Sequence, residues 1–494
     1  MAGGNKLPID NSAAPAAAPA SADPPSVSAP AEVPRASLKV TCVPEYTEVA
    51  ATQAEEILAV VGLEADAAAT GTQQQRPGVD VICVIDRSGS MAGEKLHLTQ
   101  ETLRFMVNQL SASDTLTIIT YDTNVAQPLA RTAMTPQGKR DATERIGTIK
   151  AGDATNLSGG LFRGLDAVAS RDVPNKVCSV LLMTDGQANV GLRTTAEILP
   201  RLREQLNRPG VEGACNIYTF GFGSDHDDAM LRSIAEAGRG SYYFIRDAAA
   251  IPLAFADCLG GLQSVVAQGI TVAVKAHGDV SFVNVFAGVN KVTGTVPGTA
   301  VTVDVYDIFA EEQRDFVLNV RVPAGVEPRA SETLATVTVT YLDLVYGGRR
   351  TITADLIVAR PATVPANRVR QERVEVQRHR VNLVRALEDA RRLAEQGQFA
   401  QAQTTVRTAA NSMRASPYYQ SNTVMQAMVL ETIDTEGALS SRDEYQQHGR
   451  MQISARSMAH TNQRDTNSEY SVYETNAKRS AKSAASWFFS PRKK

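Results

Sequence analysis

The stretch VDVICVIDRSGSM, residues 79–91, decides the fold predicted for this chain. Its apolar, β-branched run ends at Asp86, and the next alternate positions carry Ser88 and Ser90. A continuous apolar run such as residues 81–85 favours a strand that is buried on both faces of a parallel sheet. Side-chain oxygens that follow such a strand lie at the sheet edge where open α/β sheets bind ligands. The stretch therefore predicts a ligand site at that edge.

The side chains after this strand indicate the kind of ligand. One carboxylate and two hydroxyls are hard oxygen donors, which suit Mg²⁺ and, as alternatives, Mn²⁺ or Ca²⁺, but not zinc. The first hypothesis is therefore a divalent-cation site at the top of the sheet.

Strand and helix patterns alternate across residues 78–264. A second apolar strand is predicted over residues 176–186 and includes Asp185 near its end. The polar segment GDATNLSGGL carries Thr155 just before a helical pattern at 158–170. Repeated strand–helix units predict an α/β fold with a doubly wound, mostly parallel sheet and right-handed crossovers. The loops that follow its strands then lie at the same edge of the sheet.

The predicted site residues follow one another as Asp86, Ser88, Ser90, Thr155 and Asp185. This order resembles the metal-ion-dependent adhesion site of the von Willebrand factor A domain family, written D-x-S-x-S, then threonine, then aspartate. The phrases ATNLSGGL, LLMTDG and DDAMLRSIAEAGRGSYYFI also look like the family's. The resemblance implies a Rossmann-like domain in which these five residues bind Mg²⁺. It further implies that an exposed Asp or Glu of a partner protein replaces a water on the metal. The sequence does not assign which aspartate acts directly and which acts through a water.

The sequence on either side predicts further parts. Residues 37–77 begin with a strand pattern that is expected to join a β-sandwich, and 50–65 read as either strand or helix. Period-two strands between Gly and Pro turns over 265–361 predict an antiparallel β-sandwich. Amphipathic patterns over 365–441 predict a helical hairpin or small bundle. The Ala-, Pro- and Ser-rich residues 1–36 are predicted to be disordered.

The final residues, 442–494, are polar and are predicted to form a disordered basic tail. They end in KRSAKSAASWFFSPRKK, which has six basic residues and no acid. Basic residues around Trp487, Phe488 and Phe489 allow contact with an anionic membrane or a partner groove. A solvated tail is the favoured interpretation because terminal segments are usually free.

Composition narrows the class of protein. A chain of 494 residues is too long for one core, and its net charge of −3 gives no argument for nucleic acid. The five cysteines are scattered with no C-x-x-C pair, which excludes a zinc ribbon or RING here and favours free thiols in a reducing compartment. No signal-peptide core and no apolar stretch of about 18 residues is seen. We expect a cytoplasmic protein without a transmembrane segment.

The order of the predicted parts gives a second, looser resemblance. It is similar to intracellular eukaryotic proteins with a von Willebrand factor A domain and a C-terminal module called Vwaint. Some relatives carry a RING, U-box or Hint module, which links them to ubiquitin transfer. This chain lacks the cysteines and histidines of a RING and shows no U-box pattern. The alternative function is thus a non-enzymatic adaptor in ubiquitin-related or trafficking assemblies, with the metal site incidental.

Enzymatic interpretations find little support. A serine hydrolase needs a base beside its nucleophile, and Ser88 and Ser90 lie in SGS and not in a G-x-S-x-G elbow. His226 is the nearest candidate base, in the acidic segment SDHDD. A helix N-terminus capped by Asp227 explains that segment more simply than a second metal site. The Gly-rich stretches SGGLFRG and GFGSD do not match a nucleotide-binding motif. We therefore expect no enzymatic activity.

Overall fold

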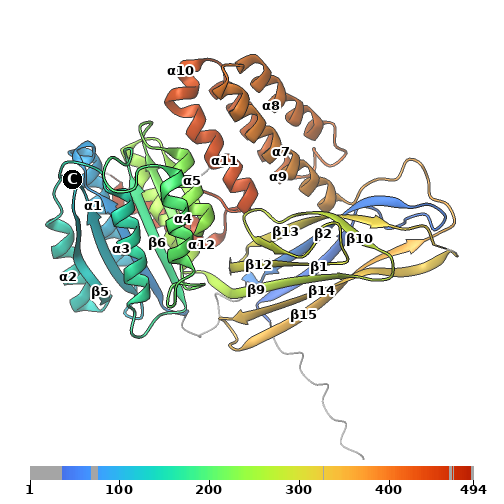
Figure 1. Cartoon of the computed structure of the whole chain (residues 1–494), viewed down its shortest axis with the longest axis horizontal. Helices are drawn as coiled ribbons and strands as arrows, with labels where there is room; N and C mark the ends of the chain where they lie inside the picture. The colour runs from blue at the N-terminus through green and yellow to red at the C-terminus, as the bar shows by residue number, and fades with distance from the viewer. Residues whose placement is uncertain (1–35, 68–75, 326, 467–469, 471, 491–494) are drawn as a thin grey trace, which may run out of the picture. The chain divides into compact units, whose positions relative to one another are not determined.

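The computed structural model describes residues 36–67, 76–325, 327–466, 470 and 472–490. Its six-stranded sheet has the order β5-β4-β3-β6-β7-β8, and Figure 1 labels β5 and β6 of this sheet. The strands are β3 (Val79–Asp86), β4 (Thr115–Tyr121), β5 (Val125–Ala133), β6 (Val177–Thr184), β7 (Asn216–Phe222) and β8 (Arg239–Ile245). All neighbours pair in parallel except β5, which runs antiparallel to β4. The predicted doubly wound, mostly parallel sheet is confirmed.

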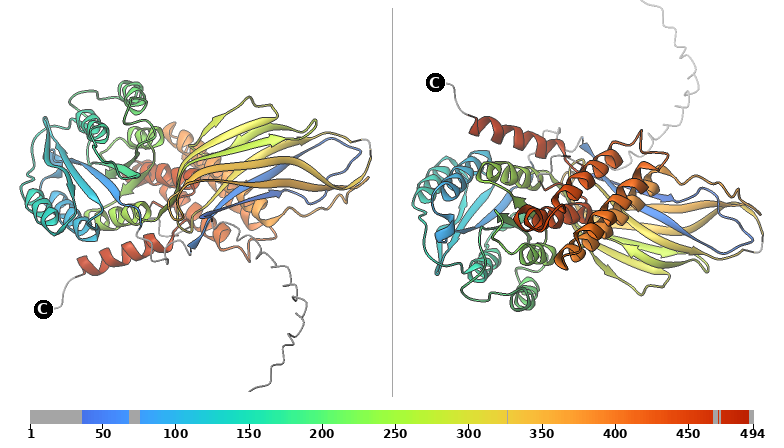
Figure 2. Two further views of the ribbon diagram at one scale, coloured as in Figure 1. Left: turned by 90° about the horizontal axis from the view of Figure 1, so that it is seen from below. Right: turned by 90° about the horizontal axis from the view of Figure 1, so that it is seen from above.

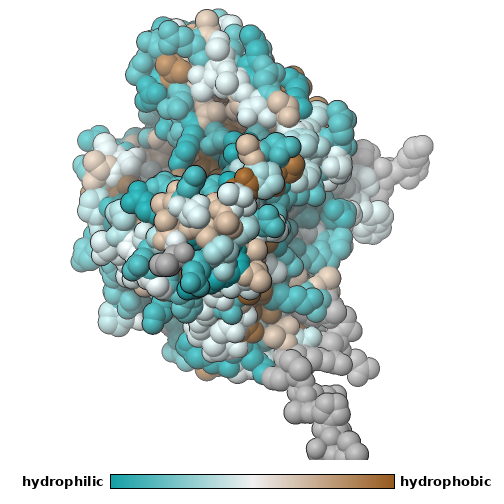
Figure 3. All heavy atoms as spheres, turned by 90° about the vertical axis from the view of Figure 1, so that its right-hand side faces the viewer, coloured by the Kyte–Doolittle hydropathy of each residue, from teal (hydrophilic) through white to brown (hydrophobic). Residues whose placement is uncertain are grey.

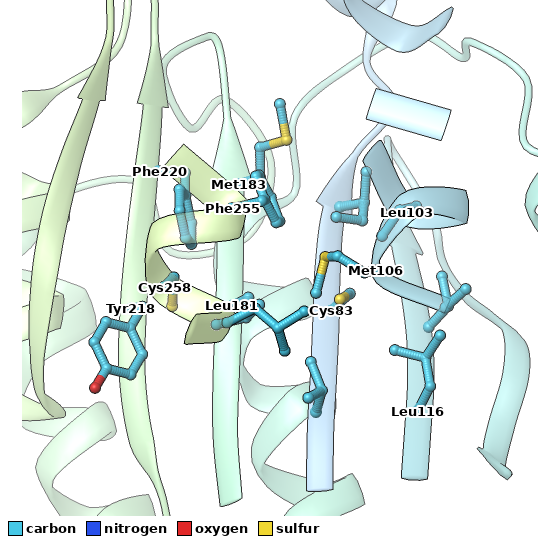
Figure 4. Close-up of a cluster of buried hydrophobic side chains, with 14 of the residues drawn as sticks. Cys83, Leu103, Met106, Leu116, Leu181, Met183, Tyr218, Phe220, Phe255 and Cys258 are labelled. Atoms are coloured by element: carbon cyan, nitrogen blue, oxygen red, sulfur yellow. The ribbon is translucent and has the colours of Figure 1, made fainter. Parts of the chain in front are cut away.

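Helices cover both faces of this sheet (Figure 1). They are α1 (Glu94–Gln109), α2 (Pro136–Gly147), α3 (Leu157–Ala169), α4 (Thr195–Leu206), α5 (Asp228–Ala237) and α6 (Ile251–Leu262), with short 3₁₀ turns η2 (Gly89–Met91) and η3 (Ala248–Ala250). Because side chains alternate along a strand, Cys83 of β3 joins the core under α1 and α6, and Val84 joins the core under α3. Figure 4 shows the first core, to which β6 contributes Leu181 and Met183 and α1 contributes Leu103 and Met106. Each fully buried aliphatic side chain contributes about 1.5 to 3 kcal/mol to the free energy of folding, relative to the same side chain in water. The two cores thus fix the sheet between its helices.

Two antiparallel sheets form a second part of the chain. The first has the order β1-β2-β13-β10 and the second β11-β12-β9-β14-β15. Their strands are β1 (Leu38–Pro44), β2 (Glu55–Ala65), β9 (Val265–Ala276), β10 (Ser281–Phe286), β11 (Lys291–Thr293), β12 (Ala300–Phe309), β13 (Gln313–Val322), β14 (Arg329–Asp343) and β15 (Arg349–Arg360). One apolar core draws residues from both sheets. Residues 55–65, for which the sequence allowed strand or helix, pair with β1 and β13 as a strand.

Helices make up most of the remaining described chain. They are α7 (Glu372–Glu395), α8 (Phe399–Arg414), α9 (Thr423–Ala438), α10 (Arg442–Glu444), the π-helical turn η4 (Tyr445–Gly449), α11 (Arg450–Asn462) and α12 (Asn476–Phe489). A shared apolar core joins α7, α8 and α9. No helix in the described ranges has the length and apolar character needed to cross a membrane. The face drawn in Figure 3 is mostly hydrophilic, with small, separated apolar patches.

The predicted disordered tail over 442–494 is wrong where the structure places α11 and α12. The polar composition of α11 did not predict that this helix packs on β8. Met458 and Asn462 are buried there: Met458 Sδ accepts from the Tyr242 backbone N–H, and Asn462 Nδ2 donates to the Gly240 carbonyl. The helix α12 packs along α6 (Figure 2). Tertiary contacts therefore order a segment whose composition predicts a free tail. The predicted disorder of residues 1–36 lies almost entirely outside the described residues.

Two buried contacts hold α12 in place. Lys478 Nζ lies 2.8 Å from Asp257 Oδ2 of α6, and both side chains are almost completely buried. The rings of Phe488 and Phe489 pack at 5.6 and 6.1 Å from the ring of Phe105 on α1. The two aromatic residues are thus partly covered, whereas Trp487 is 72% exposed.

Candidate metal-binding site

The ends of two neighbouring strands bring two carboxylates together. β3 ends at Asp86, and Asp185 directly follows β6. The two strands pair in parallel, with Ile85 opposite Met183, so both carboxylates lie at the same edge of the sheet. Both residues are at most 1% exposed. The fold therefore places two acidic groups in one buried position.

Hydrogen bonds fix the carboxylate of Asp86. Its Oδ1 accepts from the Ser88 backbone N–H at 2.8 Å, and its Oδ2 accepts from Thr184 Oγ1 at 2.6 Å. Burial raises the pKa of Asp86 from 3.8 to about 6, against the lowering effect of these hydrogen bonds. The hydrogen bonds therefore hold the carboxylate in one orientation, while its burial destabilises the ionised form.

The serine hydroxyls connect the two aspartates. Ser88 Oγ lies 3.1 Å from Ser90 Oγ, which donates to Asp185 Oδ1 at 2.6 Å. Between the serines, the Gly89 backbone N–H donates to the Asp153 carbonyl at 2.9 Å, which ties this loop to the loop that carries Thr155. The loops after β3 and β6 thus place hydroxyls and carboxylates side by side, and the loop that carries Thr155 is held against them.

Thr155 completes the set. Its backbone N–H donates to Asn189 Oδ1 at 2.7 Å, and its carbonyl accepts from the backbone N–H groups of Asn189 and Val190. A Cβ added to Gly186 would lie 3.6 Å from Ser90 Oγ and 3.9 Å from Thr155 Oγ1, so both hydroxyls border the same glycine. The structure thus brings all five predicted site residues together.

The donor set fits a hard divalent cation. It offers two carboxylates and three hydroxyls, and oxygen is the donor that Mg²⁺ and Ca²⁺ prefer. Within the described ranges there is no cluster of three or more His, Cys, Asp or Glu side chains that could hold a metal ion, so hydroxyls would have to complete the ligand set here. Metal binding by these residues stays a prediction.

Sequence reasoning missed several residues of the site. Lys95, in the first turn of α1, donates from Nζ to Asp185 Oδ2 at 2.6 Å. Thr184 and Asn189 hold Asp86 and Thr155 through the hydrogen bonds given above. Thr184 belongs to the phrase LLMTDG and directly precedes Asp185, so its position next to a predicted ligand could have indicated that it lies at the site. Nothing in the local pattern pointed to Lys95.

The acidic segment around His226 has a structural explanation. His226 is fully buried, and its Nε2 lies 2.7 Å from the Tyr242 hydroxyl. Burial lowers its pKa below 6.5. Asp227 caps α5 by accepting from the Met230 backbone N–H, and Asp228 Oδ1 lies 2.8 Å from Arg450 Nε. These contacts agree with the helix-cap interpretation of the segment.

Sequence comparison identifies the α/β region. Residues 79–244 match the family model described as von Willebrand factor type A domain. The chain is 26% identical over 374 residues to the E3 ubiquitin-protein ligase WAV3 of Arabidopsis thaliana. The aligned region covers 73% of this chain and 45% of that protein. It is 30% identical over 167 residues to the inter-alpha-trypsin inhibitor heavy chain H3 of Mesocricetus auratus, covering 33% of this chain and 18% of that protein. The chain thus spans less than half the length of these curated relatives.

Two solved structures share the fold over most of the chain. A von Willebrand factor type A protein from Catenulispora acidiphila superposes with a TM-score of 0.61 at 17% identity, covering 81% of this chain and 90% of that one. The ArnB paralog VWA2 from Sulfolobus acidocaldarius gives a TM-score of 0.55 at 17% identity, covering 86% and 98%. These structures and the sheet order show the same fold, and the family match identifies residues 79–244 as a von Willebrand factor type A domain.

Proposed function

We propose that the von Willebrand factor type A domain is a divalent-cation-dependent protein-binding module. Its metal ligands are Asp86, Ser88, Ser90, Thr155 and Asp185, and its cation is Mg²⁺, with Mn²⁺ or Ca²⁺ as alternatives. An exposed Asp or Glu of a partner protein binds at the cation. The observation that carries the proposal is the convergence of two buried carboxylates and three hydroxyls at one sheet edge.

The chain's own groups prepare this site. Thr184 and the Ser88 backbone N–H orient Asp86, and Ser90 orients Asp185, so little ordering remains when a ligand binds. The three hydroxyls add oxygen ligands without adding negative charge. When bound, Mg²⁺ supplies a position at which a carboxylate oxygen of the partner replaces a water. The positive charge of the cation thus favours an acidic side chain over a neutral one.

A non-enzymatic adaptor in ubiquitin-related or trafficking assemblies is the second candidate. The likeness to WAV3, named a ubiquitin ligase, favours it, because that likeness extends well beyond the α/β domain. In this alternative the metal site is incidental to assembly. A Vwaint identity for the C-terminal part, a cytoplasmic location and the absence of a nucleic-acid partner also stay predictions.

Calorimetric titration of the full chain with Mg²⁺ tests the proposal. We expect wild-type binding that is lost in Asp86→Ala and reduced in Thr155→Ala. Asp153→Asn is the matched control, since this exposed carboxylate lies in the Thr155 loop and its variant should bind like wild type. Circular dichroism checks that each variant is folded. Equal titration curves for wild type and Asp86→Ala would contradict the metal site.

Capture of partner proteins with and without EDTA separates the two candidate functions. A metal-dependent module should lose its partners on chelation and in both the Asp86→Ala and Thr155→Ala variants. Partners that stay bound in EDTA and on both variants would favour the adaptor alternative.

A further inference from the structure

Lys95 brings a positive charge into the candidate metal-binding site. Its Nζ lies 2.6 Å from Asp185 Oδ2, while Asp185 Oδ1 accepts from the Ser90 hydroxyl. The Asp185 side chain has no exposed surface, and the Lys95 side chain is 35% exposed. Both oxygens of this carboxylate are thus engaged by the chain itself.

The fold fixes the lysine in this position. Lys95 is the second residue of α1, which begins just after the turn η2. Its Nζ also lies 5.7 Å from the ring centroid of Phe222 on β7, and the face of an aromatic ring attracts an ammonium ion. Asp86 is held differently, by a backbone N–H and a threonine hydroxyl. The lysine therefore balances one of the two carboxylates.

We propose that Lys95 is a resident counter-ion that competes with the divalent cation for Asp185 and biases the loaded site toward anionic ligands. The proposal rests on the metal-dependent function proposed above. Lys95 and a divalent cation that share one carboxylate repel each other, and this repulsion is strong in a partly buried position. Lys95 therefore weakens the affinity of the site for metal.

The same charge has the opposite effect on the partner. At neutral pH, the two carboxylates and the ammonium of Lys95 carry a net charge of −1, which a divalent cation changes to +1. Without the ammonium, the loaded site would be neutral. Lys95 thus leaves a positive charge that attracts the carboxylate of an acidic partner residue. Removal of the lysine should strengthen metal binding and weaken carboxylate binding.

Mn²⁺ titration of the full chain, followed by acetate titration of the loaded protein, measures both effects. Water-proton relaxation reports bound Mn²⁺, and its decrease reports water displaced by acetate. Lys95→Met removes the charge at similar length, and Lys95→Arg keeps it. Lys150→Met, at an exposed lysine before the Thr155 loop, is the control for loss of a nearby positive charge.

We expect Lys95→Met to bind Mn²⁺ at least about tenfold more tightly and acetate several-fold more weakly, because the ammonium and the divalent cation share one carboxylate at close range. Lys95→Arg and Lys150→Met should behave like wild type. A misfolded variant would bind both probes more weakly, so circular dichroism first checks that Lys95→Met is folded. Equal or weaker Mn²⁺ binding by the folded variant overturns the proposal. Unchanged acetate binding overturns its second part. If wild type itself binds no Mn²⁺, the proposed function fails and this inference fails with it.

Discussion

Glu312 offers a sharp test of how the parts of the chain are held together. Its buried carboxylate accepts from the Phe309 backbone N–H at 2.8 Å and from Arg464 Nε and Nη2 at 3.0 and 2.9 Å, and it also pairs with Arg314. Arg464 binds Asp307 in addition, at 2.6 Å. Glu312 thus anchors the segment after α11 to the antiparallel sheets.

The perturbation is Glu312→Gln, which keeps the shape and removes the charge. Burial alone would raise the pKa of Glu312, but Arg314 and Arg464 outweigh it and lower the pKa from 4.5 to about 2. At about 1.4 kcal/mol for each pKa unit, ionised Glu312 contributes about 3 kcal/mol to folding at neutral pH. This agrees with the cost of about 3 to 5 kcal/mol for breaking a buried ion pair.

The sign of the pH dependence follows from the lowered pKa. The stability is fully present above the unfolded value of 4.5 and is lost as the pH falls toward about 2. By about pH 3.5 the wild type should have lost about 1.4 kcal/mol of its advantage over Glu312→Gln. Urea unfolding followed by circular dichroism at several pH values measures this.

The control is Glu56→Gln, which removes the exposed pair with Arg321. An exposed ion pair contributes at most about 1 kcal/mol. The reasoning is refuted if Glu312→Gln is no less stable than Glu56→Gln at neutral pH, or if its difference from wild type stays constant on acidification.

Three further predictions concern the stability of the fold, each measured by thermal or urea unfolding. Gly160→Ala places a Cβ 2.5 Å from the ring of Tyr121 and should cost about 1 to 3 kcal/mol; an unchanged midpoint would show that the ring moves freely. Lys478→Met leaves Asp257 buried without its nearest cation and should cost about 3 to 5 kcal/mol, with earlier proteolysis of α12; resistance equal to wild type would contradict this. Burial lowers the pKa of His226, so wild-type stability should fall below about pH 6.5, and His226→Gln should remove part of that slope.

The local sequence pattern predicts most of the strands and helices of the α/β domain. The buried run before Asp86 predicts a strand on sequence alone, and the carboxyl ends of parallel strands meet at one edge, which is why Asp185 could be paired with it. The edge strand β5 was not predicted: Pro128 interrupts it, and its residues are mostly exposed or half-buried, so it shows no buried run.

Tertiary contacts explain what local pattern did not predict. Lys95 and Asp185 are separated by 90 positions, so their ion pair has no signal within any short window. The polar helix α11 is ordered by partners far away in sequence, such as the hydrogen bond between Ser454 and Asp228. Composition predicts whether an isolated segment is ordered, and it does not include the contacts that such a segment makes with the rest of the folded chain.

The contact of Met458 and Asn462 with β8 has a consequence for synthesis. β8 is the last strand of its sheet, and an uncovered strand edge is a template for pairing with other chains. Met458 follows Tyr242 by 216 positions, so the ribosome completes the sheet long before it makes the residues that cover it. At about 5 to 20 residues per second, the nascent domain spends about 10 to 40 seconds with this edge bare. Chaperone dependence during translation should therefore be greatest in that interval and end once α11 has emerged.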